Sequence, residues 1–64
     1  MTEYRAIITF PNGKVPATLD CDSLLMFIDL LEGIKYRNSF ADIRCYRKVN
    51  NDYEYAGDFK GGRK

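Results

Sequence analysis

The sequence predicts an α+β fold in the order ββαββ, in which two antiparallel β-hairpins form a sheet and one α-helix packs on one face. Three observations support this prediction. β-branched and aromatic segments flank two turns that contain asparagine, one near the start of the chain and one near its end. Between them, apolar residues recur at helical spacing. The chain has 64 residues, which is enough for one small domain.

The first hairpin is predicted over residues 4–10 and 15–20, with Asn12-Gly13 in its turn. A register that places Phe10 opposite Val15 keeps the apolar side chains on one face of the sheet, because side chains alternate along a strand. Proline has no N–H for a strand ladder, so Pro16 predicts that the second strand lies at an edge. The other pairs in this register are Ile8 with Ala17, Ala6 with Leu19, Tyr4 with Cys21, and Arg5 with Asp20.

The helix is predicted over residues 24–32. Either Asp22 or Ser23 can serve as its N-cap, because both side chains accept hydrogen bonds from the first free amides. Gly33 is expected to end the helix in a left-handed conformation, which leaves residues 35–39 as a polar connection. The stripe expected to pack on the sheet consists of Leu24, Phe27, Ile28 and Leu31.

The second hairpin is predicted over residues 41–49 and 53–60, around a three-residue turn at Asn50-Asn51-Asp52. A register that sets Val49 opposite Tyr53 also pairs Arg47 with Tyr55, Cys45 with Gly57, and Ile43 with Phe59. On the opposite face it aligns Tyr46 with Ala56 and three pairs of opposite charge: Lys48 with Glu54, Arg44 with Asp58, and Asp42 with Lys60. Residues 1–60 are therefore expected to form the domain and residues 61–64 a flexible basic tail.

The composition excludes several classes of catalytic and metal site. The chain has no His, which excludes Ser-His-Asp and Cys-His catalytic pairs and the common zinc sites that contain His. Its glycines form no phosphate-binding loop. We therefore assign no catalytic residue, metal, cofactor or small-molecule substrate, and we expect a protein that is not an enzyme.

The location expected from the sequence is the cytoplasm. No apolar segment approaches the roughly 20 residues of a membrane-spanning helix. The first residues lack the basic and apolar regions of a signal peptide. Cys21 and Cys45 are interpreted as small buried residues that stay reduced in that compartment.

The helix has more apolar surface than one contact with a sheet requires. Met26, Leu30 and Ile34 lie on a flank away from the centre of the buried stripe. Either a curled sheet or the loop at 34–39 covers this flank, or it is exposed and binds a partner.

The leading hypothesis is a small non-enzymatic protein that binds a protein partner or a second copy as a homodimer. Its size and element order resemble small accessory or inhibitor proteins of phages and bacteria, although no motif assigns a family. The predicted contact residues are Met26, Leu30, Ile34, Tyr36 and Arg37.

The alternative hypothesis is a regulator that binds nucleic acid through the second hairpin. The formal net charge is +1, but residues 1–32 sum to −3 and residues 33–64 to +4. Cations interleaved with tyrosines suit phosphate contact and base stacking. Acidic partners across the predicted hairpin weaken this interpretation. The residues involved would be Arg44, Tyr46, Lys48, Lys60, Arg63 and Lys64.

Overall fold

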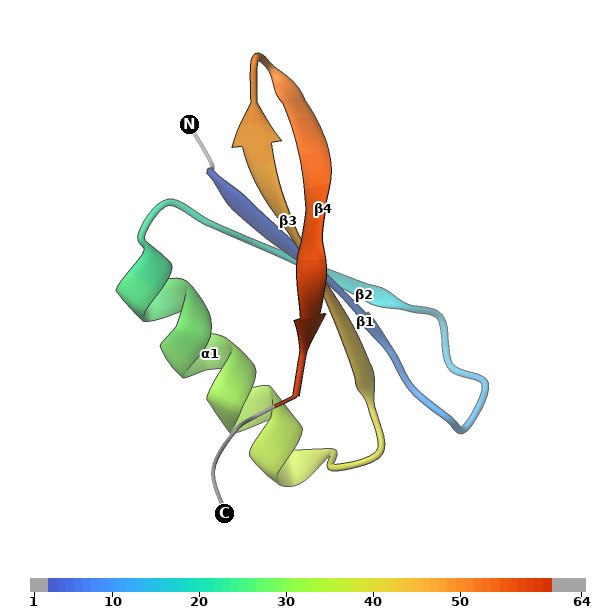
Figure 1. Ribbon diagram of the computed structural model, residues 1–64. Coiled ribbons are helices and arrows are strands. Elements are labelled where there is room, and N and C mark those ends of the chain that lie inside the picture. Colours follow the sequence, from blue (N-terminus) through green and yellow to red (C-terminus); the bar gives the residue numbers. More distant parts are fainter. Residues whose placement is uncertain (1–2, 61–64) are drawn as a thin grey trace.

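A computed structural model describes residues 3–60 as an antiparallel four-stranded sheet with one helix against one face (Figure 1). The strand order is β2-β1-β3-β4, so β1 and β3 lie in the centre while β2 and β4 form the edges. This arrangement confirms the α+β fold and the edge position of the second strand. The tail expected at 61–64 lies outside the described residues. The elements are β1 (Tyr4–Thr9), β2 (Ala17–Cys21), α1 (Leu24–Arg37), β3 (Asp42–Val49) and β4 (Asp52–Phe59).

The paired residues of the first hairpin have the predicted register, but β1 ends at Thr9 and β2 begins at Ala17, so the predicted pair of Phe10 with Val15 lies outside the ladder. The pairs within β1 and β2 run from Tyr4 opposite Cys21 to Ile8 opposite Ala17, with Arg5 opposite Asp20. Gly13 in the connection has a φ of +83°, a conformation that glycine adopts without steric cost. β1 then pairs with β3 on its other side, which joins the two hairpins into one sheet.

The hydrophobic core lies between the sheet and α1. The ring of Tyr4 stacks on Phe27, with the ring centroids 5.5 Å apart. Phe27 and Leu31 are the two helix residues that are buried, and full burial of such a side chain stabilises the fold by roughly 1.5–3 kcal/mol. The buried core residues are Ala6, Ile8, Cys21, Phe27, Leu31, Ala41 and Ile43.

The helix continues past the predicted stop at Gly33 and ends at Arg37. The sequence-based boundary was therefore wrong, and the polar connection is shorter than expected. A glycine inside a helix costs about 1 kcal/mol relative to alanine. Packing of Ile34 against the core and capping by Asn38 offset this cost, because the backbone N–H of Asn38 donates to the carbonyl oxygen of Ile34 at 2.9 Å. At the other end Ser23 is the N-cap, and its hydroxyl oxygen accepts from the amide of Met26.

The predicted buried stripe is only partly correct. Phe27 and Leu31 are buried, but Leu24 and Ile28 are exposed. The buried sheet residues beneath α1 come mainly from the central strands β1 and β3, and only the narrow helix stripe that faces them is buried. Ile34 replaces the two exposed residues by packing against the core.

The turn of the second hairpin contains two residues rather than three. Asn50 and Asn51 both have positive φ, 51° and 68°, which is the conformation that a type I′ turn requires. Val49 therefore lies opposite Asp52. Asparagine tolerates this conformation better than other residues that have a Cβ. Such a turn also matches the right-handed twist of the two strands that it joins.

A β-bulge restores the predicted register in the lower half of this hairpin. The shift occurs between Cys45 and Tyr46, opposite Ala56, and Gly57 beside it has a φ of +116°. The pairs of Ile43 with Phe59, Arg44 with Asp58, and Cys45 with Gly57 are confirmed.

Above the bulge the predicted pairs were wrong, because the two-residue turn offsets the strands by one position. The observed pairs are Tyr46 with Tyr55, Arg47 with Glu54, Lys48 with Tyr53, and Val49 with Asp52. The proposed pairing of Lys48 with Glu54 is therefore absent. Lys60 follows the last residue of β4, so the ladder does not pair it with Asp42.

Gly57→Ala should destabilise the protein by about 1–2 kcal/mol, because a Cβ at this positive φ is strained although no described atom lies within 4 Å of it. Urea unfolding followed by circular dichroism measures this change. Asn51→Gly is the matched control, since glycine adopts the same turn conformation freely, and it should not destabilise the protein. If Gly57→Ala were as stable as the wild type, the bulge would not require glycine at this position.

Candidate functional site

One flank of α1 bears a row of three exposed residues, Met26, Leu30 and Arg37, and the partly exposed Gly33, which together we call the helix flank. At about 100° per residue these four positions fall within a sector of about 60°, beside the core-facing residues. Met26 is 57% exposed and Leu30 is 41% exposed. The described sheet and the loop after the helix therefore leave both side chains largely open to solvent.

The hollows at the end of α1 show which way the helix flank faces. Arg37 lines one hollow with Phe10 and Asn12 of the connection between β1 and β2. Lys35, on the other side of the helix, lines a second hollow with Phe59 of β4. The Arg37 end of the helix flank therefore lies beside the connection between β1 and β2.

The structure brings together three of the five predicted contact residues. Met26, Leu30 and Arg37 share the helix flank. Ile34 is half-buried against the core, and Tyr36 is exposed but lies about 90° further around the helix. Sequence analysis missed Gly33, because glycine after an apolar pattern normally indicates the end of a helix. The absence of proline over the next turn is the signal that could have extended the helix.

The face of the sheet away from α1 has a cluster of three tyrosines, Tyr46, Tyr53 and Tyr55, which we call the tyrosine face. The two-residue turn creates this cluster, because it places Tyr55 opposite Tyr46 and Tyr53 opposite Lys48 on that face. The rings of Tyr46 and Tyr55 meet edge to face, with centroids 5.7 Å apart. The hydroxyl of Tyr55 donates to Asp58, and this hydrogen bond raises the pKa of Tyr55 above its ordinary value.

Cations on the tyrosine face have acidic neighbours on the same face. Arg5 donates to the carboxylate of Asp20 through Nε at 2.8 Å and through a terminal nitrogen at 3.2 Å. Its guanidinium also lies 4.2 Å from the centroid of the Tyr53 ring. Arg44 lies opposite Asp58 in the ladder. The surface therefore combines aromatic rings with nearly balanced charge.

The predicted nucleic-acid residues are only partly gathered. Arg44, Tyr46 and Lys48 alternate along β3 and share the tyrosine face. Lys60 lies beyond the end of β4, beside the hollow that Lys35 lines. Arg63 and Lys64 lie outside the described residues.

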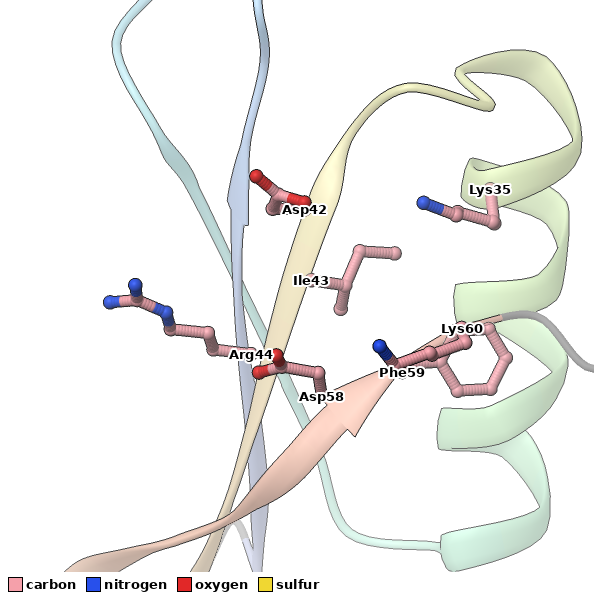
Figure 2. Close-up of a pocket in the computed structure, with 7 residues that line it drawn as sticks. All are labelled: Lys35, Asp42, Ile43, Arg44, Asp58, Phe59 and Lys60. Carbon is pink, nitrogen blue, oxygen red and sulfur yellow. The ribbon is translucent and has the colours of Figure 1, made fainter.

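The hollow between the end of α1 and the ends of β3 and β4 has a volume of about 420 Å³ (Figure 2). Lys35 reaches from the helix toward β3 and donates to the carbonyl oxygen of Ala41, while Arg44 points away (Figure 2). Residues 3–60 contain no group of three or more His, Cys, Asp or Glu side chains that could hold a metal ion. The mixed charges of the hollow favour no single ligand. Its lining residues are Lys35, Asp42, Ile43, Arg44, Asp58, Phe59 and Lys60.

The two cysteines are free thiols in positions that disfavour reactivity. Cys21 is buried at the end of β2, and its thiol donates to the carbonyl oxygen of Ser23 at 3.5 Å. Cys45 is half-buried, and this burial together with the nearby charge of Asp58 raises the pKa of its thiol. A raised pKa lowers the fraction of the nucleophilic thiolate at neutral pH.

Comparisons with protein-family models, with curated proteins and with solved structures gave no match to this chain. Within residues 3–60, no helix is long and apolar enough to cross a bilayer.

The ion pair of Arg5 and Asp20 should make the free energy of unfolding depend on pH. Hydrogen bonds from Arg5 lower the pKa of the Asp20 carboxyl below that of the unfolded chain. The stabilising contribution is then complete above the ordinary aspartate pKa of about 4 and is lost as the pH falls through the lowered value. In urea unfolding at a series of pH values, Asp20→Asn should lose stability at neutral pH and converge with the wild type in acid.

Arg5→Gln provides the matched variant for this prediction. It should reduce the same acid dependence, and combining it with Asp20→Asn should reduce that dependence no further, since both changes remove one interaction. An undiminished acid dependence in both variants would show that the pair does not contribute it.

Proposed function

We propose that the protein is a non-enzymatic binding protein that acts through protein–protein contact at the helix flank. The observation behind this proposal is the exposure of Met26 and Leu30, which lie one turn apart on the surface of α1. Water contact with adjacent apolar side chains is unfavourable, and a partner that covers them removes this cost. Exposed apolar surface of this kind is characteristic of interaction sites.

The surroundings of Met26 and Leu30 also suit a protein interface. Methionine packs adaptably against varied surfaces because its side chain is unbranched and polarizable. Arg37 ends the row, and arginine is enriched in protein interfaces, where its planar group forms hydrogen bonds with good geometry. An apolar centre with charged groups at its edge is the usual composition of such a contact.

The site chemistry supports binding rather than catalysis. The chain lacks His. Cys45, one of its two thiols, has a raised pKa, and the other, Cys21, is buried. The hollow near Lys35 is lined by both cations and carboxylates, and this mixture favours no particular substrate. We place this binding activity in the cytoplasm, where free thiols remain reduced.

The double variant Met26→Asp with Leu30→Asp should lose its protein partners while remaining folded. A carboxylate at each position would have to be desolvated in an apolar contact, which costs several kcal/mol per unpaired charge. Both side chains are more than a third exposed in the free protein, so we expect a loss of folding stability of about 1 kcal/mol or less. Proteins retained by the immobilised wild type and variant, with nuclease present, are compared by mass spectrometry.

Leu25→Asp is the matched control, because Leu25 is 84% exposed on the same helix but lies away from the helix flank. It should retain the partners that the double variant loses. Equal retention by the wild type and the double variant, or a double variant that unfolds, would contradict a binding role for this flank.

A second candidate function is nucleic-acid binding through the tyrosine face. The observation that favours it is the register of the second hairpin, which gathers Tyr46, Tyr53 and Tyr55 beside Lys48 on the uncovered side of the sheet. Exposed tyrosine rings can stack on the bases of single strands. Asp20 and Asp58 reduce the positive charge available for phosphates, so we rank this function second.

If the second function is correct, a fluorescent single-stranded oligonucleotide should bind with an affinity that falls as salt increases. Tyr46→Ala should weaken binding by about 1–3 kcal/mol through lost stacking, measured by fluorescence anisotropy. Tyr36→Ala is the control on the helix and should bind as the wild type does. The absence of binding at low salt would exclude this function.

A further inference from the structure

Gly33 has no evident role in the fold of its own chain. It lies inside α1, and no described atom is within 4 Å of the position that a Cβ would occupy. Its φ is not positive, so the backbone does not require glycine there. Glycine is also the poorest helix former after proline. A residue that weakens the helix without serving its packing suggests close approach by something outside the chain.

Leu30 supplies a projecting group one turn before this gap. Both residues belong to the helix flank, with Met26 at one end and Arg37 at the other. Two such rows fit together when they run in opposite directions. Leu30 of each copy then lies over Gly33 of the other, and Met26 lies along the aliphatic part of Arg37. One register serves both pairs, because Met26 lies four residues before Leu30 and Arg37 lies four residues after Gly33.

The charges along the helix favour the same direction. Asp22 precedes α1 and Asp29 lies in its first half, whereas Arg37 is its last residue and belongs to the helix flank. An antiparallel copy places the acidic end of each helix beside the basic end of the other, and the helix dipoles are also opposed. A parallel copy would bring like charges together. In the antiparallel register Asp22 lies four residues beyond Met26, the position opposite Arg37 of the other copy.

We propose that α1 pairs antiparallel with α1 of a second copy, forming a symmetric homodimer centred between Leu30 and Gly33. This inference rests on the proposed function and names the partner as the same chain. A two-fold axis makes the contact self-complementary, so the dimer closes without leaving an unpaired flank. The row of four residues and the two oppositely charged ends of the helix together define the interface.

Sedimentation velocity and light scattering of the full chain from micromolar to millimolar concentration test the homodimer. The wild type should change from monomer to dimer as concentration rises. Gly33→Leu should lower the association constant by about tenfold or more, because the larger side chain prevents close approach of Leu30. Leu25→Asp, off the helix flank, should dimerise as the wild type does. Circular dichroism establishes that each variant is folded.

Gly33→Ala provides a second measurement that does not depend on the larger substitution. Alanine favours the helix, so the isolated chain should become more resistant to urea while its association weakens. A merely structural role for Gly33 cannot change folding stability and association in opposite directions. Association of Gly33→Ala equal to or tighter than that of the wild type would contradict the inference.

The direction of pairing is tested by mixing two variants. Arg37→Asp and Asp22→Arg should each dimerise less than the wild type, since each brings like charges together. Their equimolar mixture should associate more tightly than either alone, because both contacts then join opposite charges.

A wild type that stays monomeric at every concentration would overturn the homodimer. A dimer unaffected by Gly33→Leu would overturn it as well, since another surface would then be responsible. Neither result removes the proposed function, which is judged by the partners that Met26→Asp with Leu30→Asp loses. If the double variant loses bound proteins although the wild type does not self-associate, the same flank binds a different protein.

Discussion

The antiparallel pairing of β1 with β3 is the contact on which the rest of the structure depends. It places the first strand of each hairpin in the centre of the sheet and brings Ala6 opposite Cys45 and Ile8 opposite Ile43. These pairs form the apolar surface of the sheet against which Phe27 and Leu31 pack. Each hairpin alone would expose its apolar face to water, and a two-stranded hairpin is at best marginally stable. The helix therefore has a surface to pack on only once this long-range pairing has formed.

The two faces of the sheet differ because of the turn and the bulge in the second hairpin. The turn at Asn50 and Asn51 offsets the upper half of the second hairpin, and the bulge beside Gly57 restores the lower half. The lower half thereby keeps Ile43 and Phe59 toward the helix. The upper half turns Tyr53 and Tyr55 toward solvent, where they meet Arg5 and Tyr46. The turn and the bulge, where glycine adopts a positive φ without steric cost, thus together support both the core and the tyrosine face.

The helix flank is exposed because the sheet covers only one side of the single helix. Because α1 packs on the sheet through a narrow stripe that includes Phe27 and Leu31, it leaves Met26 and Leu30 exposed. Gly33 lies in the same row, and no described atom lies near the position of its missing Cβ. The proposed function and the homodimer both begin from this uncovered row, whereas the balanced charges of the tyrosine face weaken the case for nucleic acid.

The amino-acid sequence by itself determined the features that depend on near neighbours. The alternation in residues 4–10 follows from interactions a few residues apart and was confirmed. The N-cap was predicted at Asp22 or Ser23, and the structure places it at Ser23. Gly13 has the positive φ expected of the turn, although the strands end further from it than predicted. The exposed residues Met26, Leu30 and Arg37 could also be selected by helical spacing. Only the tertiary structure decided the strand order, the bulge at Ala56 and the continuation of α1 through Gly33. A local preference of about 1 kcal/mol is overridden when distant packing gains more, as at Ile34.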